Sequence, residues 1–170
     1  MTTGMKTCRV LLWLFVIVCG FELGGAMYEI RVMIPRWAAA PPQSVWDLYH
    51  VEQMYPQFAT NGARFFLIFT PALGLLSLLT LGACFATRGL HRNPLLAATA
   101  LVIAIVVTTF VYYVPNLIAI RSGAPGLSGP EIVRLVRTWT ALNWLRLVLL
   151  VLAWLCALRA LTLSPAQTNT

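Results

Sequence analysis

The stretch PLLAATALVIAIVVTTFVYYVPNLIAI, residues 94–120, decides the fold, because it holds no charged side chain over its whole length. A bilayer core about 30 Å thick needs about 20 mainly apolar residues to cross it as a helix. Three further stretches meet this requirement, at about residues 10–34, 63–86 and 139–161. Backbone N–H and C=O groups in lipid must find partners within their own segment. The sequence therefore predicts an all-α protein, a four-helix transmembrane bundle.

The composition supports a single transmembrane domain over residues 1–170. Of the 170 residues, 59% are hydrophobic and only 10% are charged, whereas a soluble domain carries about 25% charged residues. The formal net charge is +7, but the basic residues are scattered between apolar segments. No basic stripe with interleaved aromatic residues is present, so we expect no nucleic-acid partner. Anionic lipid headgroups are the expected partner of the excess positive charge.

Four spans place both termini on one side of the bilayer. Basic residues in the short N-terminal tail and in the short loop 87–93 favour that side as the cytoplasm. We therefore expect an integral protein of a bacterial inner membrane with both termini cytoplasmic. A signal peptide is the alternative for the first segment, with Gly24-Gly25-Ala26 as its cleavage site. A membrane span is favoured because the apolar run is long and carries Glu22.

The loop 35–62 contains a second helical pattern. Ser44 with Asp47 three residues later resembles the start of a helix. The residues that follow give an apolar and aromatic face, which predicts a short interfacial helix over 44–55. Its Asp47, His50 and Glu52 would then lie over the polar end of the bundle.

The cysteines and histidines argue against a metal centre and against disulfides. Cys8, Cys19, Cys84 and Cys156 form no C-x-x-C pair, so we expect neither a disulfide framework, nor a thiol redox motif, nor a zinc site. The two histidines, at positions 50 and 91, fall on opposite sides of the membrane, which excludes a bis-histidine haem. A single histidine with carboxylates is the remaining metal alternative, and we expect no metal and no cofactor.

Ionisable residues are concentrated in the half of the molecule nearer the two expected long loops, 35–62 and 121–138. Glu22 and Glu29 are seven positions apart, which returns to within about 20° of the same helix face. Arg146 lies about two turns inside the last span, where a charge needs a partner. Glu22 or Glu29 is the expected partner. The ion pair has two readings, a purely structural contact between helices or part of a reaction site.

A carboxylate in an apolar pocket can serve as a general base, and an arginine can stabilise an enolate or peroxide anion. The candidate catalytic residues are Glu29, His50 and Arg146. His50 also suits a plain interfacial position. The candidate substrate-binding residues share a place near the long-loop end; they are Glu22, Tyr28, Trp37, Trp46, Tyr112, Asn116 and Asn143. Such a site would activate an acidic C–H substrate toward O2 without a cofactor.

Two segments carry a resemblance to a known family. GGAMYEIRVMIPRWAAAPPQSVWD, residues 24–47, and RTWTALNWLRL, residues 137–147, resemble the DUF1772 family of anthrone oxygenase-like membrane proteins. Tyr28-Glu29, Pro35 with Trp37, and Asn143 with Arg146 carry most of the likeness. The resemblance implies cofactor-independent oxygenation of anthrones to anthraquinones, although many bacterial members have no known activity.

Two functions of different classes remain open. The first is an oxygenase that acts on a hydrophobic aromatic ketone. The second is a non-catalytic small subunit or assembly partner of a larger membrane complex, or a homo-oligomer, in which the ion pair only fixes the bundle. Oxygen uptake with an anthrone distinguishes them, as does co-purification of a stoichiometric partner.

Overall fold

The computed structural model describes residues 3–55, 61–85 and 90–164, and all regular structure in this part of the chain is helical. The elements follow one another as α1 (Thr3–Tyr28), η1 (Glu29–Met33), α2 (Ile34–Ala38), α3 (Gln43–Met54), α4 (Asn61–Phe85), α5 (Arg92–Thr108), η2 (Thr109–Tyr113), α6 (Val114–Arg121) and α7 (Gly129–Leu163). Here η denotes a π-helical turn, in which the backbone hydrogen bonds skip five residues instead of four.

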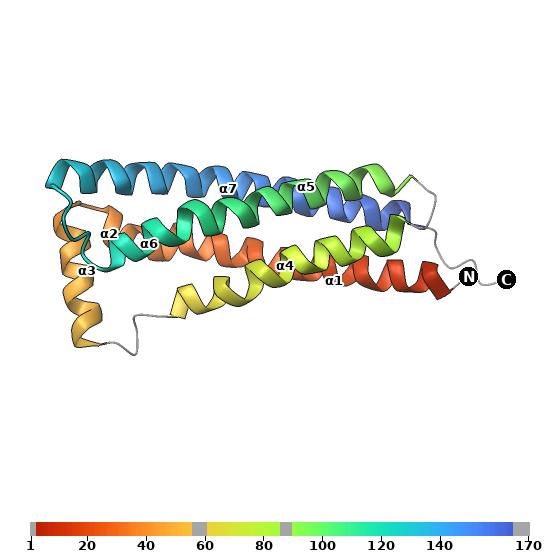
Figure 1. Cartoon of the computed structure of the whole chain (residues 1–170), viewed down its shortest axis with the longest axis horizontal. Helices are drawn as coiled ribbons and strands as arrows, with labels where there is room; N and C mark the ends of the chain where they lie inside the picture. The colour runs from red at the N-terminus through yellow and green to blue at the C-terminus, as the bar shows by residue number, and fades with distance from the viewer. Residues whose placement is uncertain (1–2, 56–60, 86–89, 165–170) are drawn as a thin grey trace.

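Four helices in the described chain are long and apolar enough to cross a membrane, which confirms the predicted four-helix bundle. They are Gly4–Ala38, Phe65–Phe85, Arg92–Arg121 and Gly129–Leu163. Successive helices run in opposite directions, and α1 and α7 carry the two ends of the chain at the same end of the bundle (Figure 1). Around the bundle, α1 packs on α4, α4 on α5, α5 on α7 and α7 on α1.

Two helices extend further than the apolar runs predict. The fourth begins at Gly129, ten residues before the expected start at residue 139, so the expected loop 121–138 is shorter. Ser128 caps this helix, since its backbone N–H donates to Glu131 Oε2 at 2.8 Å and Pro130 occupies the first turn. The first span continues through η1 and α2 to Ala38. Of the short loop expected at 87–93, residues 87–89 lie outside the described residues, and α5 begins within it at Arg92.

The interfacial helix predicted over 44–55 is confirmed as α3, Gln43–Met54. It lies across the bundle axis at the end away from the termini (Figure 1). The expected role of Ser44 as its cap is wrong, because the Ser44 hydroxyl donates to the carbonyl of Trp37 at 2.6 Å. Asp47 instead accepts a hydrogen bond from Gln43 at 2.7 Å. Ser44 thus ties α3 to the end of the first span.

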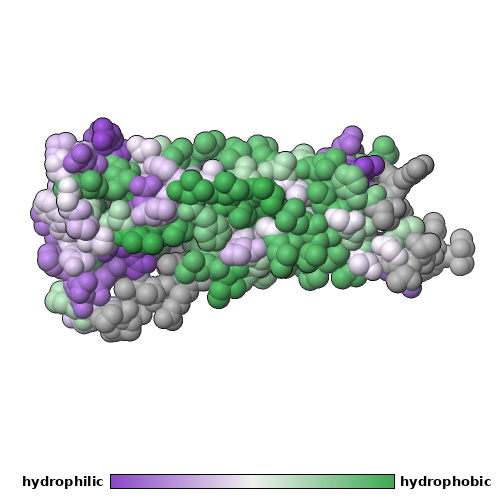
Figure 2. All heavy atoms as spheres, in the orientation of Figure 1, coloured by the Kyte–Doolittle hydropathy of each residue, from purple (hydrophilic) through white to green (hydrophobic). Residues whose placement is uncertain are grey.

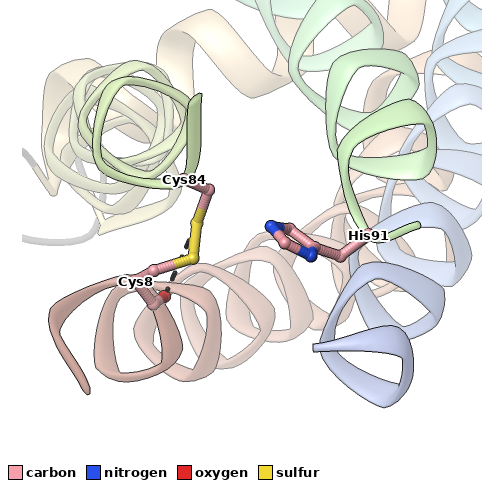
Figure 3. Close-up of side chains that lie close together, drawn as sticks. All are labelled: Cys8, Cys84 and His91. Carbon is pink, nitrogen blue, oxygen red and sulfur yellow. Dashed lines mark hydrogen bonds between the residues drawn. A yellow bond between two sulfur atoms is a disulfide. The ribbon is translucent and has the colours of Figure 1, made fainter. Parts of the chain in front are cut away.

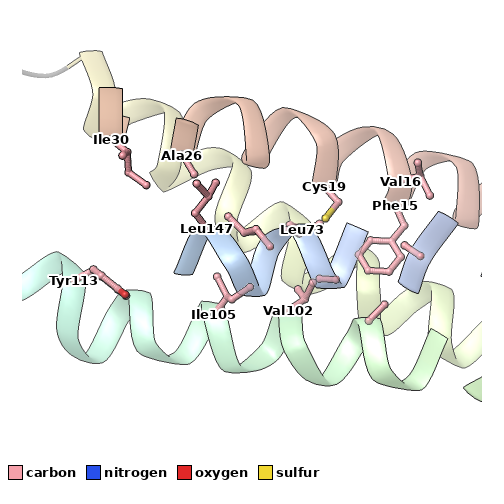
Figure 4. Close-up of a cluster of buried hydrophobic side chains, with 14 of the residues drawn as sticks. Phe15, Val16, Cys19, Ala26, Ile30, Leu73, Val102, Ile105, Tyr113 and Leu147 are labelled. Carbon is pink, nitrogen blue, oxygen red and sulfur yellow. The ribbon is translucent and has the colours of Figure 1, made fainter. Parts of the chain in front are cut away.

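Apolar side chains fill the bundle axis and also cover its outside. Phe15, Cys19, Leu73 and Val102 from three helices meet in the interior (Figure 4). Figure 2 shows an apolar band around the middle of the bundle, with hydrophilic residues gathered mainly at the end that carries α3. Because lipid tails are as apolar as these side chains, an outer apolar surface is what a bilayer requires.

The expectation of no disulfide is wrong, because Cys8 and Cys84 form one. Sequence spacing does not reveal this pair, since 76 residues separate the two cysteines. The antiparallel packing of α1 on α4 brings the first turns of one helix to the last turns of the other. Both sulfur-bearing residues are buried, with 4% and 0% of their surface exposed.

The absence of a side chain at Gly25 allows α1 to pack closely against Phe65 of α4. A Cβ atom at Gly25 would collide with the Phe65 ring, whereas a Cβ atom at the neighbouring Gly24 meets nothing within 4 Å. We expect Gly25→Val to lower the free energy of unfolding by about 1–3 kcal/mol through overpacking. Gly24→Val is the matched control and should be close to neutral. Thermal unfolding in detergent measures both, and equal effects would contradict the close packing of Phe65 on Gly25.

Candidate active site

A buried ionic cluster joins the first and last spans. The Arg146 guanidinium on α7 lies 3.1 Å from Glu22 Oε1 and 3.8 Å from Glu29 Oε2. The three side chains are 5%, 0% and 12% exposed, respectively. Glu22 and Glu29 face the same way because seven residues make nearly two helical turns. The predicted partnership of Arg146 with one of these acids is confirmed, and Arg146 contacts both.

The two acids in the cluster are held differently. Glu22 Oε1 accepts hydrogen bonds from the Thr70 hydroxyl at 2.5 Å and from Arg146 at 3.1 Å. Glu29 Oε2 is buried, and its 3.8 Å approach to Arg146 is too long for a hydrogen bond. With both acids ionised the cluster has one carboxylate more than it has guanidinium groups. Glu22 therefore neutralises Arg146, and Glu29 has an oxygen available for a further partner.

Aromatic rings enclose the guanidinium. The Cζ atom of Arg146 lies 4.7 Å from the centroid of the Phe66 ring and 5.5 Å from that of Tyr113. Cations over aromatic faces are stabilised by the ring quadrupole, more strongly where water is excluded. Tyr113 is fixed in turn, because its hydroxyl donates to the carbonyl of Leu142 at 2.6 Å. The rings therefore hold the charge in place without removing its hydrogen-bonding capacity.

Glu29 and Arg146 face a cavity of about 550 Å³. Small-molecule pockets span about 300–1,000 Å³ and are mainly apolar, with a few polar groups. This cavity fits that description, since most of its wall is aromatic or aliphatic and comes from η2, α6, α4 and α3; it includes Tyr49, Phe66, Leu67, Thr109, Phe110, Tyr113, Leu117, Ile118 and Trp139. Arg121, which pairs with Glu52 on α3 at 2.9 Å, also lines it.

Both π-helical turns lie at this site. η1 begins at Glu29, and η2 ends at Tyr113. Each is followed by a proline at the second position of the next helix, Pro35 and Pro115. A proline cannot donate a backbone hydrogen bond, and the wider turn accommodates its ring. The chain continues as a helix past Pro115 to Arg121.

Part of the cavity wall is built from aromatic residues that pack edge to face. Trp139 packs edge-on against Trp37, with ring centroids 4.9 Å apart, and against Tyr113 at 6.1 Å. Its indole N–H donates to the carbonyl of Tyr113 at 3.4 Å. The amide of Asn143 donates to the carbonyl of Trp139, one turn earlier in α7, at 2.9 Å. Trp37 and Asn143 thus lie behind the cavity wall and support Trp139.

The remaining predicted site residues lie elsewhere. Tyr112 and Asn116 line a separate cavity of about 370 Å³ between α6 and α7. Tyr28, Trp46 and His50 are exposed, and the structure does not bring them to the cavity that Glu29 and Arg146 line. His50 packs against the Tyr49 ring, with centroids 5.6 Å apart.

Sequence reasoning missed several residues of the cavity, chiefly Phe66, Tyr113, Trp139 and Arg121. An ideal α-helix through residues 109–116 presents Tyr112 together with Asn116. The structure keeps Tyr112 with Asn116 at the separate cavity. The π turn adds one residue and shifts the register, and Tyr113 lines the cavity of Glu29 and Arg146. The proline two residues after Tyr113 is the one sequence signal for this shift.

The sequence profile described as anthrone oxygenase matches residues 65–156, more than half of the chain. The chain belongs to the anthrone oxygenase family. The matched region carries Phe66, Tyr113, Trp139 and Arg146 but not Glu22 and Glu29, which lie before it. It includes the resembling segment 137–147, and segment 24–47 falls outside it. No curated protein and no solved structure was found to match this anthrone oxygenase family member.

Proposed function

We propose that this protein is a cofactor-independent oxygenase that converts a hydrophobic aromatic ketone of the anthrone class to a quinone inside the membrane. The observation that carries the proposal is the placement of a carboxylate and a guanidinium, Glu29 and Arg146, in the wall of an otherwise apolar cavity. Family membership supports the same class of substrate.

Glu29 is the proposed general base. Its Oε2 atom is buried and makes no hydrogen bond, so it is available to the acidic methylene group of a bound ketone. Glu22 is not available, because it is fully buried and engaged by Thr70 and Arg146. A positioned base contributes about 10²–10⁴-fold to the rate of proton abstraction.

Arg146 is the proposed stabiliser of the anion. Removing the methylene proton produces an enolate whose negative charge is spread to the ketone oxygen, and a fixed cation in a dry site stabilises such a charge strongly. The Nε atom of Arg146 is buried and has no hydrogen-bond partner in the described structure. The N–H group at Nε can therefore donate a hydrogen bond to the oxygen of the enolate.

The reaction balances without a cofactor because O2 is the oxidant. Glu29 accepts one proton from the methylene carbon, and the enolate forms a C–O bond with O2 to give a peroxide anion. That anion takes up a proton, and the hydroperoxide then loses water as the remaining C–H bond breaks and the O–O bond cleaves. The sum is anthrone plus O2 to anthraquinone plus water.

The substrate is proposed to enter from the lipid. The first turns of α4 diverge from α6 (Figure 1), and both helices contribute exposed apolar side chains to the cavity lining. Leu67, Phe110 and Ile118, all in the cavity lining, are 55%, 44% and 64% exposed. Because these side chains face the acyl chains, a flat apolar ketone dissolved in the bilayer reaches Glu29 without crossing water.

Narrowing the entrance should weaken substrate uptake. We expect Leu67→Trp to raise KM for an anthrone about tenfold, because the indole occupies part of the opening. The neighbouring Ile68 is 66% exposed and does not line the cavity, so Ile68→Trp is the matched control. Steady-state kinetics in lipid nanodiscs measure both, and equal KM values for the two variants would contradict entry at Leu67.

The proposed function is tested by incubating the purified protein with an anthrone after metal chelation. Oxygen consumption and anthraquinone formation should rise together, one to one, above the rate without protein. Absence of turnover together with a stoichiometric partner protein in mild detergent would contradict the proposal and favour the non-catalytic subunit.

A further inference from the structure

A second cluster lies at the opposite end of the bundle from the ionic cluster. Cys8 lies near the start of α1, Cys84 lies in the last turn of α4, and His91 immediately precedes α5. The three side chains converge in the space between the helix ends, with the imidazole directed at the two sulfur atoms (Figure 3). One ligand atom from each residue lies within 4.8 Å of the other two, and all three residues are buried.

We propose that the reduced form of this cluster binds one Zn²⁺ ion through the two thiolates and the imidazole, and that the disulfide form does not. Zn²⁺ favours cysteine and histidine, at about 2.3 Å for sulfur and about 2.0 Å for nitrogen. Ligand atoms around tetrahedral zinc therefore lie about 3.5–3.8 Å apart. The ligand atoms now lie within 4.8 Å of one another, so zinc binding requires the freed thiol side chains to rotate and the His91 ring to move slightly closer.

The redox step balances with a dithiol as the reductant. Two electrons and two protons from the dithiol convert the Cys8–Cys84 bond into two thiols. Zinc then displaces both thiol protons, since only thiolates bind the metal. Oxidation reverses the sequence, because a sulfur in a disulfide carries no charge with which to hold the ion.

The two states tie together different parts of the bundle. The disulfide links α1 to α4 only, whereas zinc on His91 would also link α5. The zinc form therefore fixes three helix ends at the terminal face, and the fourth coordination position is left to water, as in zinc sites with three protein ligands.

The test uses the full chain in detergent, reduced with a phosphine or left oxidised, then exposed to ZnCl2 and desalted. Metal analysis should give one zinc per reduced chain and only the blank value for the oxidised chain. Zinc should raise the midpoint of thermal unfolding of the reduced chain alone. Variants Cys8→Ser, Cys84→Ser and His91→Asn should each lose at least about a hundredfold in zinc affinity. The double variant Cys19→Ser/Cys156→Ser is the control and should bind as wild type does.

Two results would overturn the proposal. One is a reduced wild-type chain that takes up no zinc. Cys8 and Cys84 would then serve only as a structural disulfide. The other is a Cys8 or His91 variant that binds zinc as tightly as wild type. If circular dichroism shows that a variant is misfolded, the zinc content of the reduced wild-type chain, compared with that of the oxidised chain, still tests the proposal. None of these outcomes depends on oxygenase activity.

Discussion

Replacing Glu29 by glutamine is expected to lower kcat/KM for an anthrone by about 10²–10⁴-fold, the contribution of a positioned general base. The amide has nearly the shape of the carboxylate, so the cavity is preserved. It does not accept the substrate proton. Because Glu22 still lies 3.1 Å from Arg146, the buried guanidinium keeps its partner and the fold should persist. Initial rates of anthraquinone formation measure the loss.

Glu131→Gln is the matched control for this experiment. It makes the same chemical change at an exposed position in the first turn of α7, where the side chain caps the helix, and glutamine also serves in that capping role. Its rate should stay within about twofold of wild type. A Glu29→Gln variant that turns over at the wild-type rate would remove Glu29 from the mechanism.

Replacing Arg146 by methionine is expected to have the largest effect on stability, about 3–5 kcal/mol. Glu22, fully buried, would lose its charged partner, and Glu29 would lose its only described ion pair. A buried carboxylate without a partner is costly because lipid and protein solvate it poorly. Denaturant-induced unfolding in mixed micelles, followed by circular dichroism, measures the difference.

A second substitution separates stability from catalysis. Adding Glu22→Gln to Arg146→Met removes the fully buried of the two unpaired charges while keeping an acceptor for Thr70, so part of the lost stability should return. Oxygenase activity should remain lost, because no guanidinium is present to stabilise the enolate anion. The control is Arg137→Met, an exposed arginine on the same helix, which should change stability by less than about 0.5 kcal/mol. Equal stability of Arg146→Met and Arg137→Met would contradict the buried cluster.

The four-helix fold and the ionic cluster at the centre of the site can be predicted from the sequence. Apolar length alone predicts the four spans, because lipid leaves the backbone no other way to satisfy its hydrogen bonds. The seven-residue spacing of Glu22 and Glu29 places them on one face, and the cost of a buried charge predicts that Arg146 meets them. Glu131, three residues after Ser128, with Pro130 between, would also have predicted the early start of α7.

The rest depends on tertiary contacts that local patterns do not encode. The π turn at 109–113 shifts the register by one residue, and the Tyr113 ring lies against the Arg146 guanidinium. The Cys8–Cys84 disulfide follows from the pairing of α1 with α4, not from spacing. His50 is the right residue type for a base, but the exposed face of α3 on which it lies is set by how that helix packs.

The most direct test of Glu29 as a base is hydrogen exchange without oxygen. Under anaerobic conditions in D2O, wild-type protein should speed the exchange of the anthrone methylene protons for deuterium well above the rate in empty nanodiscs, as measured by mass spectrometry. Glu29→Gln should exchange at the rate of the empty nanodiscs. Equal exchange with wild type and Glu29→Gln would contradict the account, since proton abstraction would then occur without this carboxylate.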